Sequence, residues 1–256
     1  MKVNYRISLW NYFHYIHRLS LEQVIDEVRR AGYGIELWPG WFEDRDLYAP
    51  LCRERLRVLV AEMPCSLHTG GAKDIHGHQK QIDCAAHIGA DVIVIHPGDV
   101  ADPHGNPDPA LAREAVAYAG EKGVTLALEN GPLWFLEETI VAVDGLQICI
   151  DTGHLYHSAA TRDGRKAGMA EYVNALKPRL AHLHLQDPLP KSDHYAIGTG
   201  MIPDEDWGCL LAGLEEIHFD GAAVLEVLPR TPLQLAEQSF GHLAGLGWPG
   251  PQKLSP

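Results

Sequence analysis

The sequence lacks the segments that would mark a membrane or secreted protein. No apolar run approaches the roughly 18 residues needed to cross a bilayer, and the first residues show neither the apolar core nor the cleavage site of a signal peptide. The five cysteines are an odd number, lie far apart and form no C-x-x-C pair. These absences predict a cytoplasmic protein without disulfides.

Nucleotide-binding motifs are also missing, and positive charge is scarce. No G-x-G-x-x-G or Walker-type loop follows any strand-like segment, which disfavours dinucleotide and nucleoside-triphosphate folds. Lysine and arginine total 21 residues against 34 aspartates and glutamates, for a formal net charge of −13. This balance disfavours long-range attraction to nucleic acid or to an anionic membrane. We expect a small molecule as the partner, with no role for a membrane, and a homo-oligomer stays open.

The sequence does contain a regular alternation of strand-like and helix-like segments. Eight short apolar runs are typical of strands buried on both faces, and amphipathic segments lie between them. At 256 residues the chain has the usual size of one barrel. The pattern predicts an α/β fold, a single (β/α)₈ TIM barrel over residues 1–256 with a tail at 248–256. The predicted strands are Arg6–Leu9, Gly34–Leu37, Cys65–His68, Val92–His96, Thr125–Glu129, Gln147–Asp151, Leu180–Leu185 and Ala222–Glu226.

Ionisable side chains end six consecutive predicted strands. Catalytic groups of such barrels come from the carboxyl ends of the strands, and all six side chains are of types that bind metals. A carboxylate that ends a buried strand is costly to desolvate unless a cation meets it. The pattern therefore predicts a divalent metal site. The six residues are His68, His96, Glu129, Asp151, His184 and Glu226.

The two-residue period of a strand extends this prediction into the barrel. If the six strand ends point inward, so do the residues two positions earlier. Most of these are small, as a narrow interior below a site requires. They are Ser66, Val94, Ala127, Cys149, His182 and Val224.

Neighbouring loops supply further candidates for metal or substrate binding. His154 follows Asp151 by three residues, and Asp193 and His194 lie in a polar turn after the seventh strand. Glu36 and Trp38 lie at the end of the second strand, where an aromatic ring can stack on a sugar or exclude water.

Other interpretations of the same residues remain open at this point. Glu129, Asp151, His184 and Glu226 can form a structural ion-pair network, although three converging carboxylates would repel one another without a cation. The remaining histidines can contact substrate or pack instead of binding a metal, and Trp38 can lie in the core instead of the pocket. The residues in question are His68, His96, His154 and His194.

Together these motifs resemble the xylose isomerase-like barrel superfamily of metal-dependent sugar isomerases and epimerases, which is related to AP endonuclease family 2. The resemblance extends over nearly the whole chain. The matching segments are Gly34-Ile-Glu-Leu37, Leu67-His68, Ile95-His-Pro-Gly98, Leu128-Glu-Asn130, Ile150-Asp-Thr-Gly-His154, His182-Leu-His-Leu185, Ile197-Gly-Thr-Gly200 and Val224-Leu-Glu226.

The resemblance implies an activity and a division of roles. It implies a sugar isomerase or epimerase acting on a small ketose or a related polyol ketone, through an enediolate stabilised by a divalent metal. Glu129 and Glu226 would form the acid/base pair and, with Asp151 and His184, hold the metal. The ion would be Mn²⁺ or Zn²⁺, with Mg²⁺ and Co²⁺ as alternatives: carboxylates favour Mn²⁺, Mg²⁺ or Co²⁺, and additional histidines favour Zn²⁺.

Two alternative activities follow from the same resemblance. One is dehydration of an inosose or a dehydroshikimate-type compound. The other is zinc-dependent phosphodiester hydrolysis of the apurinic endonuclease type, because the chain matches most ligand positions of that branch. It departs from that branch where Ser192 replaces an aspartate, although Asp193 is adjacent, and where Gly198-Thr-Gly200 replaces Gly-Glu-Gly.

Overall fold

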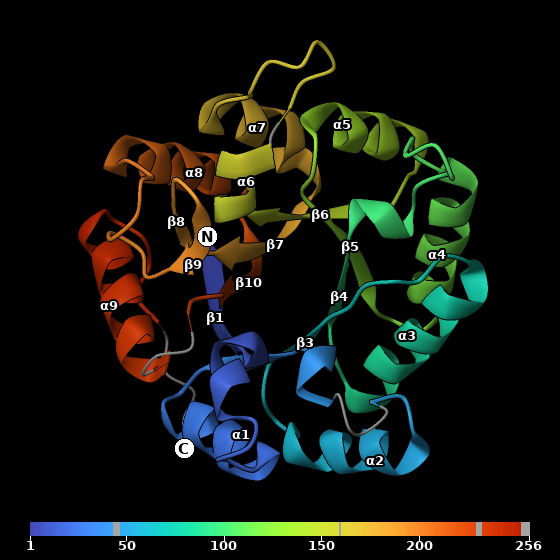
Figure 1. The fold of residues 1–256 in the computed structure, drawn as a ribbon, viewed down its shortest axis with the longest axis vertical. Coiled ribbons are helices and arrows are strands. Elements are labelled where there is room, and N and C mark those ends of the chain that lie inside the picture. The colour runs from blue at the N-terminus through green and yellow to red at the C-terminus, as the bar shows by residue number, and fades with distance from the viewer. Residues whose placement is uncertain (43–46, 159, 229–231, 252–256) are drawn as a thin grey trace.

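Eight parallel strands close into a barrel, which confirms the predicted (β/α)₈ fold (Figure 1). The computed structural model describes residues 1–42, 47–158, 160–228 and 232–251. The strand order around the barrel is β1-β10-β7-β6-β5-β4-β3-β2, and β1 pairs with both β2 and β10 to close it. The barrel strands are β1 (Lys2–Ser8), β2 (Gly34–Leu37), β3 (Cys65–His68), β4 (Val92–Ile95), β5 (Thr125–Glu129), β6 (Gln147–Asp151), β7 (Leu180–Leu185) and β10 (Asp220–Leu225).

Helices form a ring outside the strands (Figure 1). Local signals explain their ends: Ser20 and Gln23 form a capping box at the start of α1, and Gly89 ends α3 with a left-handed φ of 83°. The helices are α1 (Leu21–Arg30), α2 (Pro50–Leu59), α3 (Ile75–Ile88), α4 (Pro109–Glu121), α5 (Leu133–Ala142), α6 (Thr152–Ser158), α7 (Met169–Leu176), α8 (Asp204–Glu216) and α9 (Pro232–Gly245). Short 3₁₀ helices are η1 (Leu9–Tyr15), η2 (Pro39–Phe42), η3 (Pro97–Asp99) and η4 (Lys177–Arg179).

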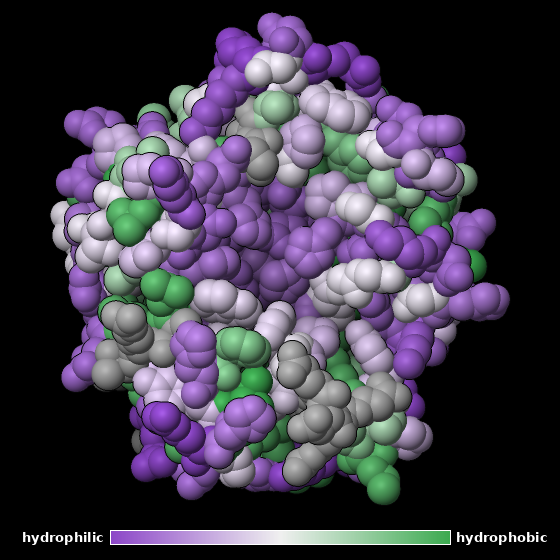
Figure 2. Space-filling view, in the orientation of Figure 1, coloured by the Kyte–Doolittle hydropathy of each residue, from purple (hydrophilic) through white to green (hydrophobic). Residues whose placement is uncertain are grey.

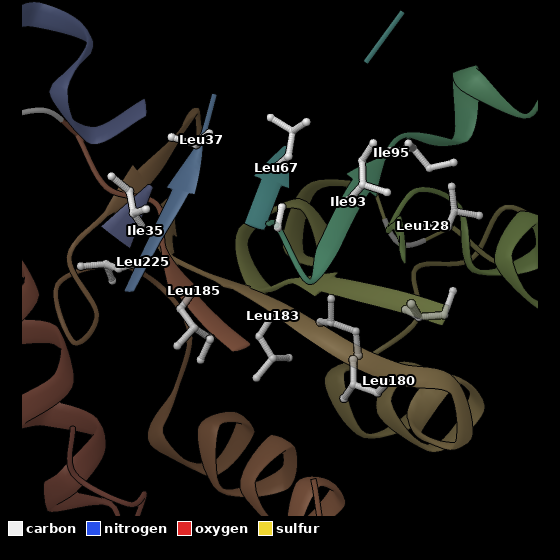
Figure 3. Packing of buried hydrophobic residues seen from close by; sticks show 14 of the residues in the cluster. Ile35, Leu37, Leu67, Ile93, Ile95, Leu128, Leu180, Leu183, Leu185 and Leu225 are labelled. Carbon is white, nitrogen blue, oxygen red and sulfur yellow. The ribbon is translucent and has the colours of Figure 1, made fainter. Parts of the chain in front are cut away.

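The main hydrophobic core lies between the barrel and its helices. Alternate strand residues such as Ile93 and Ile95 face this outer core (Figure 3). The intervening residues face the barrel interior, where Val92, Val94, Ala127 and Cys149 form a separate small cluster. The predicted inward alternation is confirmed for three of its six residues by this cluster, and Ser66 and His182 join a polar network inside the barrel.

Some predicted boundaries were wrong by a few residues. β1 begins at Lys2 and ends at Ser8, because the Ser8 hydroxyl accepts a hydrogen bond from the Trp10 backbone and starts a 3₁₀ helix there. β4 and β10 end one residue earlier than predicted, so His96 and Glu226 lie just past their strands.

Two elements near the site were not predicted. Helix α6 starts directly after β6, and an antiparallel hairpin of β8 (Asp187–Leu189) and β9 (Ser192–Tyr195) follows β7.

The C-terminal tail begins with packed residues. Trp248 is buried, and the Tyr5 hydroxyl donates a hydrogen bond to the Pro249 carbonyl at 2.7 Å. The rest of the predicted tail, 252–256, lies outside the described residues. None of the helices in the described ranges has the length and apolar character required to cross a membrane.

Candidate metal centre and active site

All eleven candidate site residues predicted from the sequence lie at or near the carboxyl ends of the strands. On the face in view, hydrophilic residues gather around a central hollow (Figure 2). A cavity of about 440 Å³ opens there. It is lined by Trp10, Trp38, Pro39, Tyr48, His68, Thr69, Gly70, His96, His154, His194 and Glu226.

His68, at the end of β3, lies between the two glutamates that the resemblance assigns to acid/base chemistry. Its Nε2 is 3.2 Å from Glu129 Oε2, and its Nδ1 is 3.3 Å from Glu226 Oε1. The two carboxylates therefore meet opposite edges of one imidazole ring. Glu226 lines the cavity, whereas Glu129 is fully buried beneath it.

Glu129 is the residue on which most of the histidines converge. His154 Nδ1 lies 3.0 Å from its Oε1, and His184 Nδ1 lies 3.5 Å from the same oxygen. His96 Nε2 lies 3.2 Å from Oε2 and 3.1 Å from His68 Nε2. The donor atoms of His68, His96 and Glu129 thus form a nearly equilateral triangle. A tetrahedral Zn²⁺ with bonds near 2.0 Å separates its ligand atoms by about 3.3 Å, so this triangle has the dimensions of a metal site.

Asp151 is held by groups that sequence reasoning missed. Gln186 Nε2 lies 3.0 and 2.9 Å from its two carboxylate oxygens. Gly153 permits this approach, because a Cβ there would lie 2.4 Å from the Gln186 side chain. Gln186 Oε1 also accepts a hydrogen bond from the His194 backbone. One glutamine therefore links Asp151 to the hairpin. In the sequence, only its position two residues after His184 indicated that Gln186 could lie in the site.

The cavity mouth contains the nominated groups of the hairpin and the aromatic residues. The Trp10 ring lies 4.2 Å from that of His194, and Trp38 lines the cavity while Trp41 packs in the core. Asp193 Oδ1 lies 2.6 Å from His157 Nε2, a histidine to which the sequence gave no role.

Glu36 lies deeper than the sequence suggested. It is fully buried, and its carboxylate contacts His184, His182 and Ser66 inside the barrel. Neither Glu36 nor these three partners are among the described residues that line the cavity, whereas the equally buried Glu129 contacts the lining residues His68, His96 and His154. We therefore separate Glu36 from the substrate-contacting candidates.

The charges in this cluster stabilise one another. Burial opposes ionisation of Glu129, but His184, His154 and His68 together outweigh it and hold the pKa of that carboxyl well below its usual range. In the same way, burial raises and His184 lowers the pKa of Glu226, to about 2. Burial lowers the pKa of His68, yet hydrogen bonds to both glutamates raise it to about 10. Asp151, then Glu129, raise the pKa of His154 to about 10. Without a metal, these histidines supply the positive charge that the carboxylates require.

The same side chains fit a divalent cation. Within the described part of the chain, Glu129 Oε2, Glu36 Oε1 and both ring nitrogens of His184 are buried and have ion-pair contacts but no hydrogen bond of regular geometry, and such atoms are costly unless something binds them. Ligand atoms within 4.8 Å of one another occur in Glu129–Asp151–His184 and, around the same His184, in Glu36–His68–His184–Glu226. Mixed carboxylate and imidazole donors suit Mn²⁺ or Zn²⁺.

Comparison with known proteins agrees with this fold. A family model described as xylose isomerase-like TIM barrel matches residues 25–246. The chain belongs to the xylose isomerase-like TIM barrel family. This confirms the resemblance inferred from the strand-end motifs. No curated protein sequence matches the chain.

Several solved structures share the fold across nearly the whole chain. A D-tagatose 3-epimerase-like protein is 20% identical with a TM-score of 0.73, over 96% of this chain and 98% of its own. A Methylomonas sp. D-allulose 3-epimerase in complex with D-allulose is 16% identical with a TM-score of 0.62, over 96% and 93%. A Thermus thermophilus protein soaked with ZnCl₂ is 23% identical with a TM-score of 0.66, over 96% and 98%.

Proposed function

We propose that this protein is a metal-dependent isomerase or epimerase of a small ketose or a related polyol ketone, with Glu129 and Glu226 as its acid/base pair. The observation that carries the proposal is the placement of these two carboxylates on opposite edges of His68, at the base of a cavity of about 440 Å³. Epimerisation next to a carbonyl removes a proton from one face of a carbon and returns one to the other face. Two carboxylates on opposite sides of a bound sugar can perform these steps in turn.

The ionised state of the pair supplies the base that the first step requires. Both carboxyl groups are held in the ionised form, each by neighbouring histidines. An ionised carboxylate accepts the proton from carbon, and His68 between the two glutamates can relay protons because each of its ring nitrogens contacts one of them. Glu226 reaches the substrate directly from the cavity wall, and Glu129 acts from beneath it.

Glu129, Asp151, His184 and Glu226 would hold the divalent cation, which would polarise the substrate carbonyl and stabilise negative charge on its oxygen. Gln186 would fix the Asp151 carboxylate by its amide contacts with both oxygens. This leaves proton transfer to the two glutamates.

The cavity has the size and lining for a monosaccharide. Trp10, Trp38 and Tyr48 supply rings that can cover the apolar face of a sugar, and His96, His154 and His194 supply hydrogen bonds to its hydroxyls. Similar folds in proteins named for D-tagatose and D-allulose epimerisation support ketohexoses as the first substrates to examine.

A screen against substrates tests the proposal. Protein loaded with Mn²⁺ or Zn²⁺ is incubated with ketohexoses, ketopentoses and inososes, and the products are separated by chromatography. We expect a ketose to be converted to its epimer or to an aldose. Loss of water from an inosose would instead assign the dehydratase. If the metal-loaded protein converts none of these compounds, the isomerase, epimerase and dehydratase assignments are all contradicted.

One observation favours a second candidate, a zinc-dependent phosphodiester hydrolase. Besides the triangle of His68, His96 and Glu129, the ligand atoms of His154, Asp193 and His194 also lie within 4.8 Å of one another. Together with the group around Asp151, these residues can hold more than one ion, as a hydrolase with several metals requires. The formal charge of −13 opposes it, because a DNA-binding surface is normally basic. Cleavage of abasic duplex DNA by zinc-loaded protein would support it, and one bound ion per chain without cleavage would exclude it.

A further inference from the structure

Glu36 is a fully buried carboxylate whose two oxygens have different partners. Oε2 accepts hydrogen bonds from the Ser66 hydroxyl at 2.9 Å and from His182 Nε2 at 2.9 Å. Oε1 lies 3.1 Å from His184 Nε2 and 3.8 Å from His68 Nδ1. Two donors therefore anchor one oxygen and direct the other toward the histidines of the site.

The opposite nitrogen of His184 faces the remaining ligands. Its Nδ1 lies 3.5 Å from Glu129 Oε1 and 3.7 Å from Glu226 Oε2. A neutral imidazole carries a single N–H, on one of its two nitrogens. A carboxylate at Nε2 keeps the proton on that nitrogen and leaves the lone pair of Nδ1 for the cation.

We propose that Glu36 is a positioning residue that fixes the orientation and tautomer of His184, so that Nδ1 of this ring binds the metal. The inference rests on the proposed function, because it concerns one ligand of the proposed metal centre. Glu36 acts through His184 and not on the substrate, since it is fully buried and its close partners Ser66, His182 and His184 are not among the described residues that line the cavity.

The surroundings of Glu36 require a carboxylate and not an amide. Ser66 and His182 donate hydrogen bonds to Oε2, and Oε1 faces His184 Nε2 at 3.1 Å; an ionised carboxylate presents an acceptor to all three because it carries no hydrogen. A glutamine of the same shape would direct its NH₂ group at one of these donors. Glu36→Gln therefore keeps the volume of the side chain and removes one acceptor.

The alternative role for Glu36 is that of a ligand itself. Its carboxylate belongs to a group with His68, His184 and Glu226 whose ligand atoms lie within 4.8 Å of one another. The two roles predict different numbers of bound metal ions after Glu36 is replaced. A ligand variant loses an ion, whereas a positioning variant keeps the ions with lower affinity.

The experiment compares the wild type, Glu36→Gln, Ser66→Ala and the control Thr139→Val. Thr139 is also a buried polar residue, but its hydroxyl bonds to Phe135 within α5. Mn²⁺ affinity is measured by titration calorimetry and the ion count by mass spectrometry. The proton on His184 Nε2 is observed by NMR of ¹⁵N-histidine in Zn²⁺-loaded protein. Ser66→Ala serves as a second test if Glu36→Gln does not fold, since it keeps the carboxylate but removes one of its anchors.

We expect Glu36→Gln to bind the same number of ions as the wild type with about 10- to 100-fold lower affinity, and to lose the Nε2–H signal of His184. Ser66→Ala should show a smaller loss of affinity, and Thr139→Val none. Unchanged affinity and signal in Glu36→Gln, or the loss of one ion, would overturn the inference while the proposed function stands. A wild type that binds no Mn²⁺ would instead contradict the proposed function.

Discussion

The barrel interior has two layers of opposite character. The upper layer, at the strand ends, holds the ionisable groups around Glu129 and His184, whose charges depend on one another. The lower layer beside β4, β5 and β6 is the apolar cluster of Val92, Val94, Ala127 and Cys149. Both layers arise from the same two-residue alternation of a strand. Ala127 lies two residues before Glu129 on β5, and Cys149 lies two residues before Asp151 on β6, so each pair points into the barrel at two heights.

The barrel separates stability from chemistry by placing apolar packing in the lower layer and ionisable groups in the upper layer. Val92, Val94 and Ala127 in the lower layer carry no polar group and contribute to stability by burial, whereas Cys149 lies next to His182 and His184. Converging carboxylates in the upper layer are costly to bury, and they persist because histidines, and by our proposal a cation, compensate them. Changes in the upper layer should therefore act on activity, and changes in the lower layer on stability.

The largest effect is expected from Glu129→Gln or Glu226→Gln. Each keeps the shape of the side chain but removes a base, so kcat should fall by about 10²- to 10⁴-fold while the circular dichroism spectrum is unchanged. Glu137→Gln, the same chemical change on an exposed face of α5, is the control and should keep full activity. Full activity of either site variant would refute the acid/base assignment.

Metal removal should lower both the catalytic activity and the stability of the protein. Chelation leaves the carboxylates without their cation, so activity should disappear and return when Mn²⁺ is added. Mn²⁺ at 100 times its Kd should raise the free energy of unfolding by about 2.7 kcal/mol, measured by thermal denaturation. A metal-free protein that keeps its activity and does not respond to Mn²⁺ would contradict the proposal.

Val94→Ala probes the lower layer. Removing two buried carbons should lower the free energy of unfolding by about 1.5 kcal/mol, measured by urea denaturation, because Val94 is fully buried. Turnover by the folded enzyme should not change. A drop in kcat without a loss of stability would show that the two layers are not separable in this way.

Trp38→Ala should have a smaller effect, confined to substrate binding. The ring lines the cavity and contacts Phe13 edge-on at 5.6 Å between centroids. Loss of an aromatic contact of about 0.5–1.5 kcal/mol should raise KM several-fold with kcat unchanged. Trp134→Ala, in α5 and next to Arg162, is the matched control. Equal KM values for the two variants would remove Trp38 from the binding site.

The smallest effect is expected at an exposed ion pair outside both layers. Arg165 contacts Glu171 at 2.8 and 2.6 Å, and both side chains are exposed. Arg165→Ala should leave the urea concentration at the midpoint of unfolding nearly unchanged, because water screens an exposed ion pair. A large loss of stability against urea would mean that exposed ion pairs stabilise this barrel as much as the buried residues of its interior do.

The sequence predicted the strand ends well because one local rule determines them. Apolar runs ending in His68, Glu129 or Asp151 mark buried strands, and parallel strands bring their ends to one edge of the sheet. The family match then confirmed the resemblance that these ends suggested.

Features that depend on register and loop geometry were not predictable from the sequence. Glu36 pairs with Ser66 in the sheet, two residues before His68, which places it below the cavity although it looked like a mouth residue. Such offsets come from the stagger of a closed barrel, which one sequence does not reveal. Gln186 was missed because its role depends on its reach to both Asp151 and the hairpin.

The most direct test of the central claim is proton exchange at carbon. Metal-loaded wild type and Glu129→Gln are incubated with a ketohexose in D₂O, and deuterium on the carbons next to the carbonyl is measured by NMR. We expect deuterium incorporation by the wild type and its loss in Glu129→Gln. Epimerised product without deuterium, or equal exchange by both proteins, would contradict proton transfer through Glu129.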